Sequence, residues 1–219
     1  MLEPSLIRGV IFDMDGVLLE SEPFLAEAAA KMFAEKGCAV APDEFRPYFG
    51  MGEDHLLKGV ADAHGFPLDP GPDKARTYAI YLEVIHDRIE ALPGVFDFIA
   101  SCKAHKLPIA LASSADRVKV DGNLREIKLS PETFDAMVTG SDVAKKKPAP
   151  DLFLEAARRL GLDPSTCLVV EDAIVGVAAA RAAGARCLAV STNFPREKLA
   201  DADWVVPDLS EAPREALEW

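Results

Sequence analysis

Six short apolar runs, separated by stretches with helical patterning, constrain the fold of this 219-residue chain more than any other feature. The runs are continuous rather than alternating, which is typical of strands buried on both faces of a parallel sheet. Strands that alternate with helices predict an α/β fold with a Rossmann-like parallel sheet and helices on both faces. The expected strands are residues 7–14, 108–112, 136–139, 167–170, 186–190 and 204–206, and the expected helices among them are 94–106, 115–128, 150–161 and 173–184.

One long stretch breaks this alternation. Between residues 21 and 90 the pattern predicts helices alone, at 23–37, 53–64 and 73–90. We therefore expect an α-helical cap domain over 21–90, inserted after the first strand of a core domain formed by 1–20 and 91–219. Ligands of open α/β sheets bind beyond the carboxyl ends of the strands, so this insertion would cover the site as a lid.

Charge and composition argue against several classes of partner. The chain has 24 Lys and Arg against 36 Asp and Glu, so neither nucleic acid nor a membrane surface is an expected partner. No apolar run reaches the ~18 residues that span a bilayer, and the first residues do not resemble a secretory signal. We therefore expect a cytoplasmic protein that is a monomer or a weak dimer. The four widely spaced cysteines form no CxxC motif and are expected to act as buried apolar residues.

Two acidic residues follow the first expected strand. Asp13 and Asp15 flank a single residue, so in an extended chain both side chains can point to the same side. Two carboxylates this close are costly unless a cation lies between them or one of them holds a proton. Mg²⁺ prefers oxygen ligands of this kind. The alternative interpretation is a plain Asp-Gly turn after a strand.

Two further strand ends and one loop carry polar residues. Ser113 and Ser114 follow the second strand, where hydroxyl and backbone N–H groups can bind phosphate oxygens or merely cap a helix. Lys147 precedes a proline, which disfavours helix and places its ammonium in an extended stretch. Glu171 and Asp172 follow the fourth strand and could bind a metal, although Asp172 could instead cap the next helix. Together these residues predict a phosphoryl-transfer site at one edge of the sheet.

These residues resemble the four motifs of the haloacid dehalogenase-like (HAD) superfamily. The motifs are DxDGV at residues 13–17, the strand-end Ser113, the Lys147 of KPAPD, and the acidic pair Glu171 and Asp172. The helical insertion resembles the C1 cap of subfamily I, which includes β-phosphoglucomutase and phosphoglycolate phosphatase-like enzymes. The stretches LASSADRVKVDGNL and KPAPDLFLEAA also resemble a domain of a plant chloroplast member of the family.

The resemblance implies a Mg²⁺-dependent phosphatase that hydrolyses a small phosphate monoester, such as a sugar phosphate or a phosphoglycolate-like acid, through an aspartyl-phosphate. Asp13 would be the nucleophile, and Asp15 would be the general acid and then the base. Ser113 and Lys147 would hold the phosphoryl oxygens. Other expected contacts to the substrate or its phosphate are Gly16, Ser114, Gly50, Glu53, His55 and Arg117, and the implied metal ligands are Asp13, Asp15 through its carbonyl, Asp172, and Glu171 through water.

Two alternatives remain open. A β-phosphoglucomutase-like sugar-phosphate mutase needs a second phosphate site in the cap, but this chain has Leu25 where those enzymes have a histidine and Glu53 where they have an arginine. The resemblance therefore favours a hydrolase. The second alternative is a catalytically silent HAD scaffold that acts as an interaction module. For His55 the alternative to substrate contact is a solvated loop histidine, and for Gly50 it is a simple turn.

Overall fold

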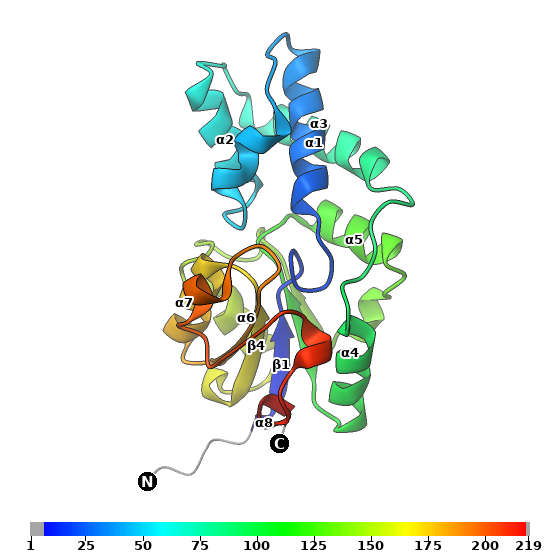
Figure 1. Cartoon of the computed structure of the whole chain (residues 1–219), viewed down its shortest axis with the longest axis vertical. Helices are drawn as coiled ribbons and strands as arrows, with labels where there is room; N and C mark the ends of the chain where they lie inside the picture. The colour runs from blue at the N-terminus through cyan, green and yellow to red at the C-terminus, as the bar shows by residue number, and fades with distance from the viewer. Residues whose placement is uncertain (1–6, 218–219) are drawn as a thin grey trace.

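A six-stranded sheet forms the centre of the structure, a computed structural model that describes residues 7–217 (Figure 1). All neighbouring strands are parallel, in the order β3-β2-β1-β4-β5-β6. The expected α/β fold with a Rossmann-like sheet is thus confirmed. Residues 1–6, 218 and 219, which we assigned to the core domain, lie outside the described residues. The strands are β1 (Gly9–Phe12), β2 (Ile109–Ala112), β3 (Ala136–Val138), β4 (Cys167–Glu171), β5 (Arg186–Val190) and β6 (Trp204–Val206).

Helices cover both faces of the sheet, which explains why the strands are apolar except at Glu171 and Arg186, at the ends of β4 and β5. On β1, Val10 and Phe12 pack in a cluster with residues of α4 and α5, whereas Ile11 packs on the opposite face with residues of α6 and α7. β1 is shorter than expected because the chain turns at Met14, whose carbonyl accepts the N–H of Leu18 at 2.9 Å. The helices of this part are α4 (Val95–Ala104), α5 (Arg117–Glu126), α6 (Asp151–Leu160), α7 (Ile174–Ala183) and α8 (Arg214–Leu217), and its 3-10 segments are η2 (Pro131–Thr133), η3 (Pro164–Thr166), η4 (Arg196–Leu199) and η5 (Leu209–Glu211).

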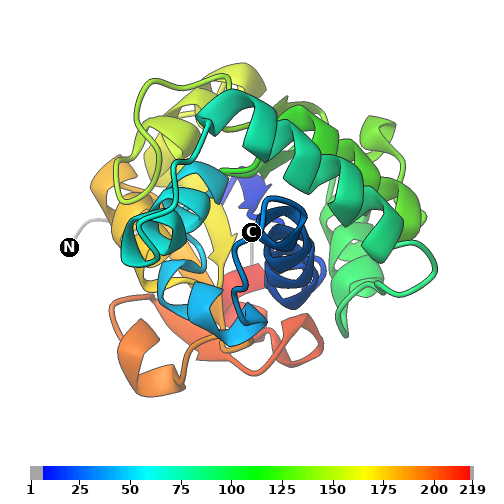
Figure 2. The same ribbon diagram turned by 90° about the horizontal axis from the view of Figure 1, so that it is seen from above.

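The segment between β1 and α4 is helical and lies above the carboxyl ends of the strands (Figures 1 and 2). Phe33 packs against Phe45 and Phe66, with ring centroids 6.0 and 4.9 Å apart, so this segment has apolar packing of its own. The 3-10 segment of this insertion, η1 (Pro42–Tyr48), was not expected from the sequence. None of the helices in the described part of the chain is long and apolar enough to cross a membrane. The elements are α1 (Glu22–Glu35), η1 (Pro42–Tyr48), α2 (Glu53–Ala63) and α3 (Pro70–Val84).

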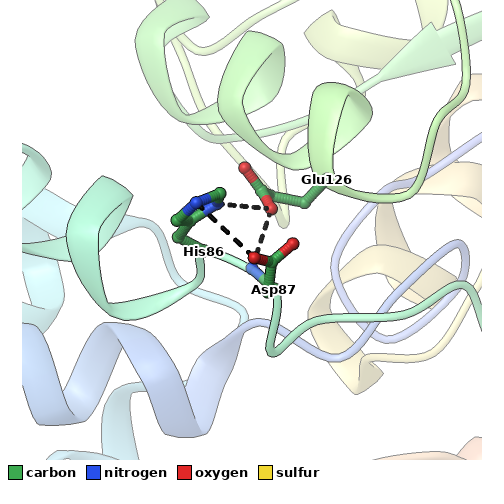
Figure 3. Close-up of side chains that lie close together, drawn as sticks. All are labelled: His86, Asp87 and Glu126. Carbon is green, nitrogen blue, oxygen red and sulfur yellow. Dashed lines mark hydrogen bonds and ion pairs between the residues drawn. The ribbon is translucent and has the colours of Figure 1, made fainter.

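The chain returns from this insertion along a turn beside α5 (Figure 3). α3 ends six residues earlier than expected, and the following turn places Asp87 at a φ of 56°. The Asp87 N–H donates to Glu126 Oε2 at 3.1 Å, and His86 Nδ1 lies 3.5 Å from the same oxygen. The His86 and Asp87 side chains are 71% and 88% exposed. We therefore interpret their contacts with Glu126 as structural contacts that hold the turn against α5. The proposed division into a cap of 21–90 and a core remains a prediction.

Candidate active site

The carboxylate of Asp13 lies buried at the end of β1, next to an ammonium group from a distant loop. Lys147 Nζ donates to Asp13 Oδ1 at 2.6 Å and also to Glu171 Oε1. Burial raises the pKa of Asp13 to about 7, although Lys147 acts in the opposite direction. Burial disfavours the Lys147 ammonium, but the adjacent Asp13 and Glu171 outweigh this effect and raise its pKa. The pair therefore places a carboxylate and a fixed positive charge side by side at the sheet edge.

Three buried carboxylates gather around this point. Ligand oxygens of Asp13, Glu171 and Asp172 all lie within 4.8 Å of one another. Burial, together with the charges of Glu171 and Asp13, raises the pKa of Asp172 well above its ordinary value. When all are ionised, three carboxylates face one ammonium, so two negative charges remain uncompensated. Clustered hard oxygen donors with this charge fit a divalent cation such as Mg²⁺.

Hydrogen bonds fix two of these carboxylates in place. Glu171 Oε2 accepts the N–H groups of Asp172 and Ala173, each at 2.7 Å. Asn193 Nδ2 donates to Asp172 Oδ2 at 2.7 Å. Because both Glu171 oxygens already have partners, its carboxylate suits a contact through water better than a direct one.

Two glycines make room for this acidic cluster. A Cβ on Gly176, in the first turn of α7, would lie 1.8 Å from Glu171 Oε1. A Cβ on Gly16 would lie 2.1 Å from Asp172 Oδ2, and Gly16 has a φ of +77°, which side-chain-bearing residues rarely adopt. Gly16 therefore lies against the Asp172 carboxylate, and its expected contact with the phosphate remains a prediction.

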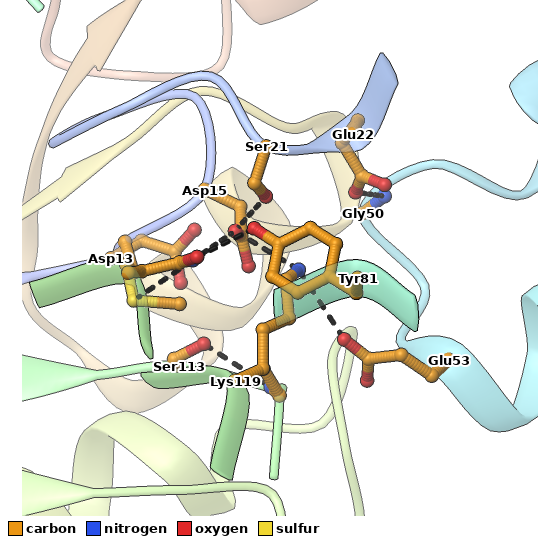
Figure 4. Close-up of polar contacts among 12 residues, drawn as sticks. Asp13, Asp15, Ser21, Glu22, Gly50, Glu53, Tyr81, Ser113 and Lys119 are labelled. Carbon is orange, nitrogen blue, oxygen red and sulfur yellow. Dashed lines mark hydrogen bonds and ion pairs between the residues drawn. The ribbon is translucent and has the colours of Figure 1, made fainter. Parts of the chain in front are cut away.

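Asp15 faces a different set of partners (Figure 4). Its Oδ1 accepts from Ser21 Oγ, from Lys119 Nζ at 3.0 Å and from Asn123 Nδ2 at 3.5 Å. Tyr81 donates its hydroxyl to Asn123 Oδ1 at 2.5 Å. These contacts connect Asp15 to the residue before α1, to α5 and, through Asn123, to α3. The orientation of Asp15 therefore depends on both the insertion and the core.

Lys119 joins this group to two acidic residues of the insertion. Its ammonium lies 3.3 Å from Glu53 Oε1, and its side chain is 1% exposed. Burial acts against the Lys119 ammonium, but Asp15 and Glu53 raise its pKa well above the ordinary value. Glu22 accepts the Gly50 N–H at 2.9 Å. Burial raises the pKa of Glu22 to about 7, against the opposing effect of Lys119.

One pocket between the insertion and the core unites these groups. Ser113 does not line the pocket: it is fully buried, and its Oγ accepts the Ala115 N–H at 3.1 Å. Arg117 lies outside it, because it stands on the exposed face of α5 and pairs with Asp121 at 2.7 Å. His55 is also exposed and outside it. The residues expected from the sequence that line the pocket are Asp13, Asp15, Gly50, Glu53, Ser114, Lys147 and Asp172.

Sequence reasoning missed several residues of this arrangement. The most informative of them is Lys119. The spacing of apolar and polar residues along α5 could have indicated that its side chain is buried. It stands next to Val120 and four residues before Asn123, all three on the buried face of α5. A lysine at such a position needs buried acidic partners. Other residues that were missed are Ser21, Glu22, Tyr81 and Asn193.

The profile of haloacid dehalogenase-like hydrolases matches residues 7–184, most of the chain. The chain belongs to this family. The match covers the sheet from β1 to β4, the whole insertion and every strand end that carries a site residue. The family resemblance stated from the four motifs is thereby confirmed.

Named relatives in the family include phosphatases. The chain is 32% identical over 212 residues to hexitol phosphatase B of Escherichia coli, covering 92% of this chain and 93% of that protein. It is 44% identical over 201 residues to SUPPRESSOR OF QUENCHING 1, a chloroplastic protein of Arabidopsis thaliana, but it spans only 19% of that protein's length. The chain is an HAD-family phosphatase.

Solved structures agree with the fold. CbbY from Rhodobacter sphaeroides, solved in complex with phosphate, superposes with a TM-score of 0.88 at 26% identity, covering 98% of this chain and 100% of that one. A mutant of the same protein was solved in complex with xylulose-(1,5)bisphosphate. The match extends across the insertion as well as the sheet, so both parts of the chain follow the family's architecture.

Proposed function

We propose that this chain is a Mg²⁺-dependent phosphatase that hydrolyses a small phosphate monoester, a sugar phosphate or a phosphoglycolate-like acid, through an aspartyl-phosphate on Asp13. One observation carries the proposal: Asp13 lies 2.6 Å from a buried ammonium, in a cluster with Glu171 and Asp172. A carboxylate in this position can approach a phosphoryl group whose negative charge is compensated by Lys147 and by a cation bound to the acidic cluster.

In the first step, an oxygen of Asp13 attacks phosphorus, and the bond from phosphorus to the ester oxygen breaks. Asp15 gives its proton to the departing oxygen, which leaves as an alcohol. The Lys147 ammonium compensates charge on the phosphoryl oxygens, and Ser113 and Ser114 provide polar groups at the end of β2. Splitting one displacement into two in this way makes each step easier.

In the second step, water attacks phosphorus and gives a proton to the Asp15 carboxylate. The bond from phosphorus to Asp13 breaks, and inorganic phosphate leaves. Mg²⁺, held by Asp13, Asp172 and the Asp15 carbonyl and by Glu171 through water, would supply charge neutralisation for the phosphoryl oxygens. The insertion over the pocket serves as a lid that excludes bulk water.

The test is release of inorganic phosphate from a panel of esters, with Mg²⁺ and with EDTA. The panel contains glucose 1-phosphate, glucose 6-phosphate, phosphoglycolate and p-nitrophenyl phosphate. We expect Mg²⁺-dependent release that Asp13→Asn abolishes while the far-ultraviolet circular dichroism stays unchanged. Release that persists in EDTA or in Asp13→Asn would contradict the mechanism, and conversion of β-glucose 1-phosphate into glucose 6-phosphate would indicate the mutase instead.

The silent scaffold explains the structure less well than the phosphatase, because it gives no reason to bury five acidic residues near two lysines, namely Asp13, Glu22, Glu53, Glu171 and Asp172. A cytoplasmic location and a monomer or weak dimer remain predictions, and the plant relative is named as a chloroplastic protein.

A further inference from the structure

The side of the pocket next to Asp15 has a chemistry of its own. We call Glu22, Glu53 and Lys119 the acidic subsite. Glu22 and Glu53 reach it from the insertion and Lys119 from α5 (Figure 4). We infer that the acidic subsite selects an uncharged, hydroxyl-bearing leaving group and excludes one that carries a second anionic group. This inference rests on the proposed phosphatase function and names the substrate class.

The position of the acidic subsite follows from its contacts. Lys119 Nζ lies 3.0 Å from Asp15 Oδ1 and 3.3 Å from Glu53 Oε1. Asp15 is the residue that protonates the departing ester oxygen, so groups bonded to it stand beside the leaving group. All three residues of the acidic subsite line the same pocket as Asp13.

Unsatisfied oxygens indicate what this side of the pocket requires. Glu22 Oε2 and Glu53 Oε2 are buried and find no hydrogen-bond partner among the described residues, and neither does Ser114 Oγ. The two glutamates are 7% and 2% exposed. Buried acceptors of this kind are costly unless something donates to them. A substrate hydroxyl can donate to them, whereas a carboxylate or an ionised phosphate offers no proton.

The balance of charge points the same way. Within residues 7–217, Lys119 and Lys147 are the basic side chains that line the pocket. Each already faces two carboxylates, Lys119 those of Asp15 and Glu53 and Lys147 those of Asp13 and Glu171. A second anion on the substrate would therefore meet excess negative charge without a free cation to bind it.

An amine-bearing leaving group also suits carboxylates, but Lys119 argues against it. Its ammonium stands between Asp15 and Glu53 and would repel a second ammonium. A hydroxyl group both donates and accepts, so it can donate to a glutamate oxygen and accept from Lys119. Hydroxyl groups thus match both charges of the acidic subsite.

The decisive experiment compares two esters of nearly equal size. Sorbitol 6-phosphate and 6-phosphogluconate differ at the far carbon, which carries a hydroxymethyl group in the first and a carboxylate in the second. With Mg²⁺ present, we expect kcat/KM for sorbitol 6-phosphate to be at least about tenfold higher, because one desolvated charge contact is worth this much. A ratio near one, or faster hydrolysis of phosphoethanolamine than of either ester, would overturn the inference.

Variants assign the effect to the acidic subsite. Glu53→Gln removes one negative charge at nearly constant shape and should lower the ratio of the two kcat/KM values about tenfold, chiefly through a lower KM for 6-phosphogluconate. Glu22→Gln should act in the same direction and serves if Glu53→Gln does not fold. Glu83→Gln, an exposed change on α3, should leave the ratio unchanged. A ratio that stays unchanged in both folded Gln variants of the acidic subsite would also overturn the inference.

Failure of this inference is distinguishable from failure of the proposed function. Hydrolysis of p-nitrophenyl phosphate depends on the phosphoryl chemistry and carries neither a hydroxyl nor a carboxylate to the acidic subsite. If the parent protein hydrolyses it with Mg²⁺ but does not discriminate between the two sugar-derived esters, only the inference fails. If no ester releases phosphate, the proposed function fails. As a second readout, calorimetry in the presence of phosphate should show that sorbitol binds more tightly than gluconate.

Discussion

Each of the two buried lysines of the site pairs with two carboxylates, one of which has a proposed catalytic role. Lys147 contacts Asp13, the proposed nucleophile, and Glu171, whereas Lys119 contacts Asp15, the proposed acid, and Glu53. Removing one partner of such a buried pair typically destabilises a protein by about 3–5 kcal/mol, because the remaining charge is uncompensated. The two lysines therefore compensate buried charge and orient the reacting groups with the same contacts.

A second residue-scale effect concerns Asp142, outside the pocket. Burial acts against its ionisation, but the guanidinium of Arg159 and hydrogen bonds from the N–H and hydroxyl of Thr139 lower its pKa from 3.8 to about 2. A carboxyl group with a lowered pKa in the folded state stabilises that state above its unfolded pKa. This contribution disappears as the pH falls from about 4 to about 2.

We therefore predict that Asp142→Asn lowers the free energy of unfolding by about 1–2 kcal/mol at pH 7. The difference from the parent should shrink steadily between pH 4 and pH 2.5, since protonation makes the parent resemble the variant. Urea unfolding at several pH values measures this, with the exposed Glu197→Gln as control. A difference that is constant across this range would exclude the linkage.

At the scale of elements, the parallel strands and the short loops that follow them position the residues of the site. Residues after β1, β2 and β4 meet at one edge of the sheet because neighbouring strands run in the same direction. α7 begins directly beyond Glu171 and Asp172, so its first turn packs against the acidic cluster. This close packing, rather than helix propensity, explains why position 176 is a glycine.

Gly176→Ala separates these two influences. Alanine favours helix over glycine by about 1 kcal/mol, yet a Cβ here would lie 1.8 Å from Glu171 Oε1. We predict destabilisation by about 1–3 kcal/mol, as for overpacked cores, and at least about a tenfold loss of kcat because the contact between Lys147 and Glu171 shifts. Thermal unfolding and phosphate release measure the two effects.

The matched control is Gly71→Ala, in the first turn of α3. Apart from its chain neighbours, its Cβ would meet no atom within 4 Å. Because Gly71 precedes Pro72, an alanine there should lower stability slightly through its contact with the proline ring, but activity should be unchanged. Equal behaviour of the two variants would show that close packing at Glu171 is not what requires glycine.

At the scale of the whole molecule, the pocket lies between the insertion and the carboxyl ends of the strands, and one hydrophobic cluster contains residues of both. Gly50 of the insertion stands over the core, where its Cβ would lie 3.1 Å from Ala173 Cβ. Ligands bound at such a junction contact groups that come together only in the folded protein. Binding there should therefore raise the stability of the folded chain as a whole.

For Mg²⁺ we predict a rise in Tm of roughly 5–10 °C at about 100 times its Kd, corresponding to ~2.7 kcal/mol. Asp172→Asn should lose at least half of this rise. Without metal the variant should be as stable as the parent or more so, because the raised pKa of Asp172 means that its ionised form is disfavoured in the fold. Differential scanning fluorimetry measures both effects, with the exposed Asp201→Asn as control, and equal shifts in all three proteins would argue against Asp172 as a ligand.

The sequence alone determined the sheet and the positions of the motif residues. Apolar runs such as that of β1 specify buried strands because every side chain must leave water on one face or the other. Asp13, Lys147 and Asp172 could be brought together without coordinates, since parallel strands end at a common edge.

Only the tertiary structure decided what surrounds Asp15. Lys119, Glu22 and Glu53 come from three helices in two parts of the chain, and their pairing depends on how the insertion packs over the core. Arg117 and Lys119 are both basic and two residues apart on α5, yet one is exposed and the other buried. Local patterns do not settle this difference, because the burial of a charge depends on partners that are distant in sequence.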